Sequence, residues 1–189
     1  MTKIENGNKE MIRRDQIRTR MQFAATAGTE ELFEKLVTGL NGIHEAFVVD
    51  YRDEYGNNKL SFGKRVSLSK KFDKTVFNPY APINVQRQGA GEIKIPLGEV
   101  VVGDIVHLSA GDMIPADMRI LKAKDLFVNQ SALTGENTAV EKFPATDQKK
   151  HDRLTKISNL AFLGSTVFSG SAIGVVVAVG DDTIFGEMA

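Results

Sequence analysis

The stretch Ser131-Ala132-Leu133-Thr134-Gly135-Glu136-Asn137 places one acidic side chain directly behind a Thr-Gly turn. Apolar residues lead into this stretch, and Val140-Glu141-Lys142 leads out of it. Glycine adopts backbone conformations that other residues avoid, so it can turn its neighbour outward. We therefore expect Glu136 to be a presented carboxylate rather than an ordinary surface charge.

Short apolar runs separated by Gly, Pro and Asp residues surround this stretch. A run that alternates with period two predicts a half-buried strand. Many short strands with Gly and Pro turns are typical of an all-β sandwich or barrel. The predicted strands are Ile83–Arg87, Ile93–Ile95, Ile105–Leu108, Met118–Ala123, Leu126–Val128, Thr166–Phe168 and Ser171–Val179, with turns at Gln88–Gly91 and Ser169-Gly170.

Two Gly-Asp pairs, Gly103-Asp104 and Gly111-Asp112, are interpreted as turns because Asp can hydrogen-bond its own backbone. The polar residues 143–152 are predicted to form a surface loop. After the last strand, Asp181 or Asp182 is expected to cap a closing helix that runs through Phe185 and Met188.

The N-terminal part has a helical pattern instead. A helix is predicted over Thr29–Leu40, with Thr29 as its N-cap and acidic residues in its first turn. A second helix is predicted from about Ile43 to Tyr55, where Gly56-Asn57 stops it. Together they would form a helical hairpin that packs on the β-rich part.

The first 22 residues are polar and basic, and we expect them to be a flexible tail. Basic residues near a membrane surface are attracted to anionic lipid headgroups. A thin apolar stripe leaves an amphipathic helix as an alternative. The predicted lipid contacts are Lys3, Lys9, Arg13, Arg14, Arg18 and Arg20.

Composition excludes several classes of protein. The formal net charge is zero, which gives no support to a nucleic-acid partner. The chain has no Cys, so it has no disulfide, thiolate metal site or Cys nucleophile. Its three His are scattered, without the spacing of a zinc site. No apolar run approaches the ~18 residues that span a bilayer.

This loop and four ordered blocks around it resemble the actuator domain of P-type ATPases, ion pumps that form an aspartyl-phosphate intermediate. The family's Thr-Gly-Glu-Ser loop is Thr134-Gly135-Glu136-Asn137 here, with Asn in place of Ser, and Ala139 stands where the family often has Pro. The resemblance extends over about residues 81–189 and is greatest to the bacterial magnesium-transporting subgroup. The other blocks are Val102–Val106, Gly111–Arg119, Gly164–Gly170 and Val179–Thr183. The fold that it implies is a distorted jelly roll, a β-sandwich, with an N-terminal helical hairpin.

The resemblance implies a catalytic role for Glu136, which would orient the water that hydrolyses the aspartyl phosphate. Thr134 and Gly135 would shape the loop, and Asn137 would keep the hydrogen-bonding role of Ser. The partners would be the phosphorylation and nucleotide-binding domains and the membrane helices of the same pump. This chain would bind no cofactor, whereas the parent pump would use Mg and ATP. It would lie on the cytoplasmic side of a cell membrane, in bacteria the plasma membrane, and would not hydrolyse ATP alone.

In such pumps a transmembrane hairpin separates the N-terminal helices from the β-rich core. We therefore expect four segments: a tail at 1–22, a helical part at 23–58, a basic linker at 59–80 and the core at 81–189. We expect the hairpin to have been removed and its ends to be joined near Tyr80-Ala81. Two alternatives stay open: the actuator of a calcium or other cation pump, and a non-catalytic β-sandwich that docks on acidic membranes.

Overall fold

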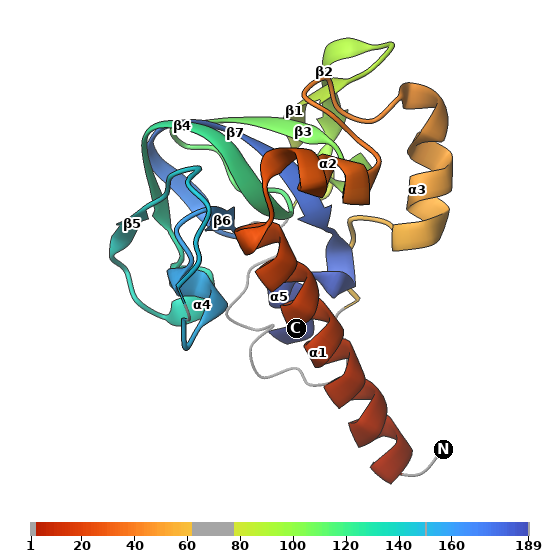
Figure 1. Ribbon diagram of the computed structural model, residues 1–189, viewed down its shortest axis with the longest axis vertical. Helices are drawn as coiled ribbons and strands as arrows, with labels where there is room; N and C mark the ends of the chain where they lie inside the picture. The colour runs from red at the N-terminus through yellow and green to blue at the C-terminus, as the bar shows by residue number, and fades with distance from the viewer. Residues whose placement is uncertain (1–2, 62–77, 150, 189) are drawn as a thin grey trace.

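The computed structural model describes residues 3–61, 78–149 and 151–188. Within them, seven strands form an antiparallel sheet in the order β2-β1-β3-β7-β4-β5, and β6 pairs with β4. The predicted β-sandwich class with N-terminal helices is confirmed (Figure 1). The strands are β1 (Pro82–Arg87), β2 (Gly91–Pro96), β3 (Ile105–Ser109), β4 (Asp117–Asn129), β5 (Ala139–Glu141), β6 (Leu160–Ala161) and β7 (Thr166–Ala178).

The long strands β4 and β7 pair from one end to the other, with register shifts along the way. Two sequence predictions were wrong here: Met118–Ala123 and Leu126–Val128 belong to one strand, and β7 runs straight through the turn expected at Ser169-Gly170. Gly170 has a φ of 79°, and a Cβ on it would lie 2.2 Å from the Asp125 carbonyl oxygen. A glycine inside a strand can therefore mark a bulge and a close approach rather than a turn.

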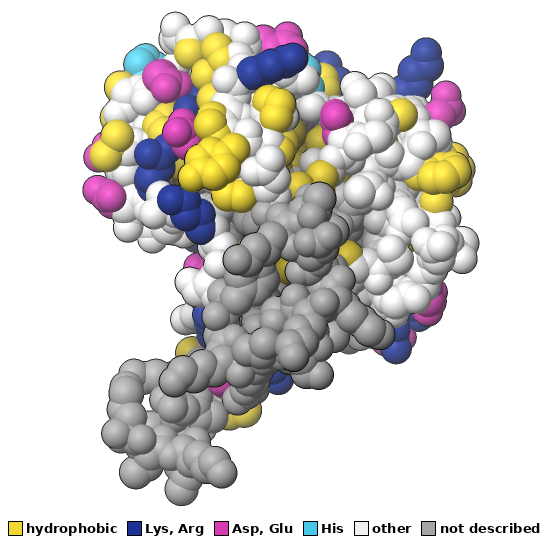
Figure 2. Space-filling view, turned by 180° about the vertical axis from the view of Figure 1, so that it is seen from behind, with side chains coloured by type: hydrophobic (Ala, Val, Ile, Leu, Met, Phe, Trp, Pro, Cys, Tyr) yellow, Lys and Arg dark blue, Asp and Glu magenta, His cyan; other side chains and the backbone are white. Residues whose placement is uncertain are grey.

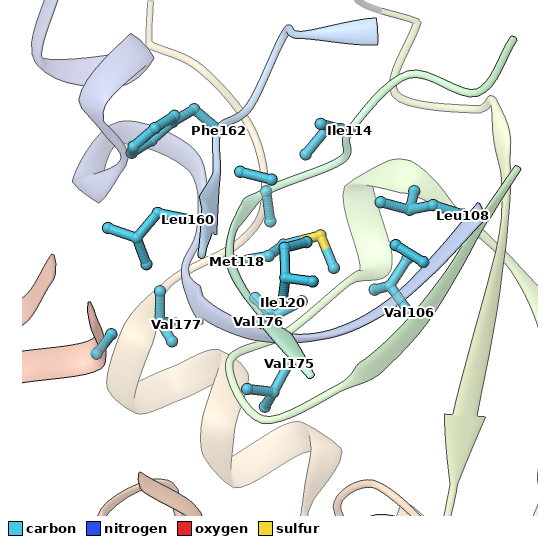
Figure 3. Close-up of a cluster of buried hydrophobic side chains, with 14 of the residues drawn as sticks. Val106, Leu108, Ile114, Met118, Ile120, Leu160, Phe162, Val175, Val176 and Val177 are labelled. Carbon is cyan, nitrogen blue, oxygen red and sulfur yellow. The ribbon is translucent and has the colours of Figure 1, made fainter. Parts of the chain in front are cut away.

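The core lies between the strands and the segments that cover them. Figure 3 shows Met118 and Ile120 of β4 beside Leu160 of β6 and the valines of β7. Val175, Val176 and Val177 follow one another and are all buried, so β7 is covered on both faces. Burying each such side chain contributes about 1.5–3 kcal/mol.

Helix α1 (Lys3–Thr26) replaces the flexible tail that we expected over residues 1–22, so that expectation was wrong from Lys3 onward. Ile17, Met21 and Ala24 recur at helical spacing and are buried against the rest of the molecule. The thin apolar stripe in the sequence was thus sufficient for packing. The N-terminal part of α1 extends away from the body of the domain (Figure 1).

The C-terminal end of α1 is fixed by donors from the β-rich part. Arg119 of β4 is buried, and its Nη1 donates to the carbonyl oxygens of Ala24, Ala25 and Ala27. Asn159 Nδ2 donates to the Ala25 oxygen at 2.8 Å. The last carbonyls of a helix have no partner within the helix, and a cation is favourable at that end. These contacts therefore join α1 firmly to the sheet.

The helical hairpin is shorter than predicted. Helix α2 (Thr29–Leu36) stops because Val37 takes a left-handed conformation with a φ of 49°, and Gly28 rather than Thr29 is its N-cap. A single turn, η1 (Glu45–Phe47), and α3 (Val48–Tyr55) stand in place of one helix from Ile43. Gly56 ends α3, as predicted.

Near the C-terminus, η4 (Gly180–Asp182) leads into α5 (Ile184–Met188). Thr183 Oγ1 accepts the Gly186 N–H at 2.9 Å, so Thr183 caps α5 and the expectation for Asp181 or Asp182 was wrong. The buried Asp117 accepts the N–H groups of Leu163 and Ile184. Burial raises the pKa of Asp117 to about 7. This carboxyl therefore joins the start of β4 to α5.

Charged side chains of both signs are intermixed with hydrophobic ones over the described atoms of the reverse face (Figure 2). In the described part of the chain, none of the helices has the length and apolarity that a bilayer crossing needs. The lysines and arginine of the predicted basic linker, at positions 64, 65, 70, 71 and 74, lie outside the described residues.

Candidate functional site

The Thr-Gly-Glu stretch closes a hairpin between β4 and β5. The two strands pair from Phe127 opposite Glu141 to Asn129 opposite Ala139. Residues 130–138 connect them, beginning with the single helical turn α4 (Ser131–Thr134). In Figure 1, α4 and β5 lie on the opposite side of the molecule from α3. The sheet thus presents this loop at one extremity of the domain.

Backbone geometry turns Glu136 outward, as predicted. Gly135 has a φ of 75°, and its N–H donates to the Ser131 oxygen at 2.9 Å. Thr134 Oγ1 donates to the Gln130 oxygen and accepts the Glu136 N–H, both at 3.1 Å. The Glu136 side chain itself is exposed. Thr134 and Gly135 therefore shape the loop, and the carboxylate is free to meet another molecule or domain.

Asn137 accepts a further hydrogen bond that crosses the loop. Asn129 Nδ2 donates to Asn137 Oδ1 at 3.0 Å, and Asn129 Oδ1 accepts the Ser131 N–H at 2.8 Å. The last residue of β4 therefore holds both the beginning of α4 and the residue after Glu136. The structure brings all four predicted site residues together in one hydrogen-bonded loop.

Sequence reasoning missed the anchor beneath this loop. Lys142 is only 2% exposed, and its Nζ donates to the carbonyl oxygens of Thr155 and Ile157 at 3.2 and 2.8 Å. Gln130, at the loop's other end, donates to the same Thr155 oxygen at 3.0 Å. The segment around η3 (Leu154–Lys156) thus holds Gln130 at the start of the loop and Lys142 just after β5. The sequence did contain a signal: alternate residues of a strand share a face, which places Lys142 on the same face as Val140 and not with the exposed Glu141.

Burial lowers the pKa of Lys142 to about 7, while the charge of Asp147 acts in the opposite direction. The ammonium group also lies 5.5 Å from the centroid of the Phe162 ring, a favourable cation–π position. Its unfolded pKa is 10.5, so the unfolded chain binds more protons between pH 7 and 10.5, and stability rises with pH in that window.

Replacing Lys142 with Met is therefore expected to remove a pH-dependent part of the stability. Between pH 7 and pH 9, the unfolding free energy of the wild type should rise relative to Lys142→Met by about 2 kcal/mol. Urea unfolding at several pH values measures it, with the exposed Lys149→Met as the matched control. If the unfolding free energies of the wild type and Lys142→Met changed equally with pH, the burial of the Lys142 ammonium group would be contradicted.

Replacing Gly135 with Ala is expected to destabilise the loop through the backbone alone. The space around Gly135 is open, because a Cβ would meet nothing within 4 Å. The left-handed conformation costs a non-glycine residue about 1–2 kcal/mol, and Asn tolerates it better than Ala. Urea unfolding should rank wild type above Gly135→Asn and Gly135→Asn above Gly135→Ala. An unchanged stability in Gly135→Ala would show that the loop takes another conformation.

Two of the predicted lipid-contact residues have partners within the chain. Arg13 pairs with Asp182 at 2.9 Å, and Arg14 pairs with Glu187 at 3.1 Å. These pairs are partly exposed, so each contributes little to stability. They join α1 to η4 and α5. Lipid contact by the six basic residues stays a prediction.

Within residues 3–61, 78–149 and 151–188, no group of three or more His, Asp or Glu side chains is placed to hold a metal ion. Asp112 accepts the Ser109 N–H at 2.8 Å, as expected of a turn.

Comparison with known families decides the relationship. A family model described as the P-type ATPase actuator domain matches residues 80–189. The chain belongs to this family. A second model, described as cation transporter/ATPase, N-terminus, matches residues 24–83, so the two matches meet at the start of the actuator core.

The actuator domain resembles parts of much longer proteins. It is 50% identical over 99 residues to the magnesium-transporting ATPase, P-type 1, of Escherichia coli (strain K12), covering 52% of this chain and 11% of that protein. It is 36% identical over 156 residues to the calcium-transporting ATPase of Bacillus subtilis (strain 168), covering 82% of this chain and 17% of that protein. The chain thus spans a small fraction of these relatives' lengths.

Proposed function

We propose that this actuator domain promotes hydrolysis of the aspartyl phosphate in a P-type cation pump, with Glu136 as the catalytic residue. The observation that carries the proposal is the exposed Glu136 on a loop whose first residue and turn are hydrogen-bonded. Phosphoryl transfer depends chiefly on positioning and on electrostatic stabilisation. A fixed loop on a rigid sheet is suited to deliver a carboxylate to a phosphate on another domain.

In this mechanism, the Glu136 carboxylate orients a water molecule in line with the phosphorus and accepts its proton. The phosphate leaves the aspartate that carries it, and the aspartate is restored. Thr134 and Asn137 act on the loop rather than on the phosphate, through the hydrogen bonds described above. The whole domain rotates into place during the pump cycle, and this movement couples phosphate loss to the membrane helices.

Magnesium is the proposed transported ion. The 50% identity to a magnesium-transporting ATPase supports this choice over the calcium-transporting relative at 36%. The partners of the actuator are the phosphorylation and nucleotide-binding domains and the membrane helices of the same pump, which uses Mg and ATP. The domain would lie on the cytoplasmic side of a bacterial plasma membrane. A calcium or other cation pump is the alternative within the family.

Steady-state ATP hydrolysis by the intact parent pump tests this function. Glu136→Gln should lower turnover by about 100-fold, because general acid–base catalysis contributes about 10²–10⁴-fold. Glu141→Gln, an exposed glutamate of the neighbouring strand, should leave turnover near that of the wild type. Turnover that survives Glu136→Gln would favour the membrane-docking alternative, in which the basic residues matter and Glu136 does not.

A further inference from the structure

A cavity of about 650 Å³ lies away from the Glu136 loop, between the N-terminal helices and the sheet. Cavities of this size with apolar walls and a few polar groups are typical small-molecule sites. Residues from α1, α2, the end of α3 and the β-rich part all line it. Its floor consists of buried apolar side chains, namely Ala24, Leu32, Leu36, Val102 and Val177.

The lining of the cavity carries an excess of positive charge. Arg20 and Lys35 line it, against one carboxylate among the lining residues, Asp15. Arg20 is half-buried, and its charge acts to lower the pKa of the buried Asp117 and of Tyr55. Among the described residues it forms no hydrogen bond or ion pair, and neither does the exposed Lys35. A half-buried cation has lost part of its hydration, and an anion bound in the cavity would replace it. Arg13 and Arg14 of the same helix, in contrast, are paired.

We propose that this cavity binds a single-chain amphipathic anion. The apolar chain lies on the buried floor, and the anionic head pairs with Arg20 and with Lys35. Ile12, which is 56% exposed at the edge of the cavity, covers the part of the chain nearest the solvent.

The bound anion would add a contact shared by all the elements that line the cavity. It would touch α1, α2, the end of α3 and the sheet at once, because all four line the cavity. A ligand that binds only the folded state raises its stability by mass action. Occupancy would therefore fix the N-terminal helices against the part of the domain that carries Glu136.

Calorimetric titration of the full chain with dodecanoate, below its micelle concentration, tests the proposal. Saturable binding of one dodecanoate is expected. A dodecyltrimethylammonium ion has the same tail and the opposite charge. It should bind at least about ten-fold more weakly, because a hydrogen bond to a charged group contributes about that much to binding affinity. Equal affinity for the two probes, or no saturable binding, would overturn the proposal.

Variants locate the site. Arg20→Gln and Lys35→Gln should each weaken dodecanoate binding by about ten-fold, while dodecanol binding stays unchanged. Arg18→Gln is the matched control, because Arg18 is exposed on the same helix and is not among the residues that line the cavity. Wild-type affinity in both Arg20→Gln and Lys35→Gln would overturn the assignment. Lys35 is exposed, so its variant remains informative if Arg20→Gln does not fold.

Binding to vesicles distinguishes a free amphipathic anion from a membrane surface as the ligand. Vesicles of phosphatidylcholine with phosphatidylglycerol should bind Arg20→Gln and Arg18→Gln equally, because a diffuse surface charge does not distinguish them. If the wild type binds these vesicles and not submicellar dodecanoate, the cavity proposal is wrong and a lipid surface is the ligand.

Discussion

Replacing Arg87 with Met is expected to destabilise the domain by about 3–5 kcal/mol, because it leaves a buried carboxylate without its partner. Arg87 is 3% exposed and Asp104 is fully buried. The guanidinium donates from Nε and Nη2 to the two Asp104 oxygens at 2.8 and 2.9 Å. Its Nη2 also donates to the Glu99 oxygen at 3.1 Å. Such a loss is a large fraction of the stability of a typical domain.

Lowering the pH should reduce the stability that Arg87→Met loses. Burial raises the pKa of Asp104, while the pairing with Arg87 lowers it, so removal of Arg87 raises it further. A raised folded pKa gives a carboxyl stability at low pH that is lost as the pH rises. The Arg87→Met variant should therefore lose less relative to the wild type at pH 5 than at pH 8.

Urea unfolding of Arg87→Met, Asp104→Asn and the double variant measures the pair. The double variant should be more stable than the sum of the two single losses predicts, because it removes both charges together. Strictly additive losses, or a loss below about 1 kcal/mol in Arg87→Met, would contradict a buried and mutually dependent ion pair.

This pair also shows where the sequence was informative and where it was not. The Gly103-Asp104 turn was predicted correctly, because turn residues act locally. The role of its carboxylate was not, since Arg87 lies 17 residues away in the chain and reaches Asp104 only through the pairing of β1 with β3. An Asp that only forms a turn and an Asp that also forms a buried ion pair look the same in the sequence.

The same limit explains the errors in secondary structure. Gly170 has the local signal of a turn, yet a bulge at Asp125 on the neighbouring strand makes it a point of close approach. The first residues have the composition of a tail, yet the four buried side chains of α1 and the Arg119 contacts hold them as a helix. In both cases tertiary contacts override local preference.

For the candidate site, the sequence predicted the loop and its presented carboxylate because Thr134, Gly135 and Glu136 interact within a few residues. The supporting contacts were not predicted. Lys142 has the appearance of a surface charge in the sequence, and its burial depends on the η3 segment that folds beneath the loop.

Replacing Glu136 with Gln is expected to lengthen the lifetime of the phosphorylated pump by about 100-fold or more, since the proposed general base would be lost and such a base contributes about 10²–10⁴-fold. Gln has the size of Glu but cannot accept a proton from water. The loop should keep its shape, because its hydrogen bond at this position comes from the backbone N–H of Glu136 and not from the side chain. Formation of the phosphorylated pump from ATP should be unaffected, so the phosphorylated form accumulates.

Decay of the phosphorylated intermediate in the intact parent pump, after a chase with unlabelled ATP, tests the central claim most directly. The comparison is between the wild type, Glu136→Gln and the control Glu141→Gln. We expect Glu136→Gln to be phosphorylated normally and to lose its phosphate about 100-fold more slowly, with Glu141→Gln matching the wild type. Loss of phosphate from Glu136→Gln at the wild-type rate would contradict the assignment of Glu136 as the catalytic residue.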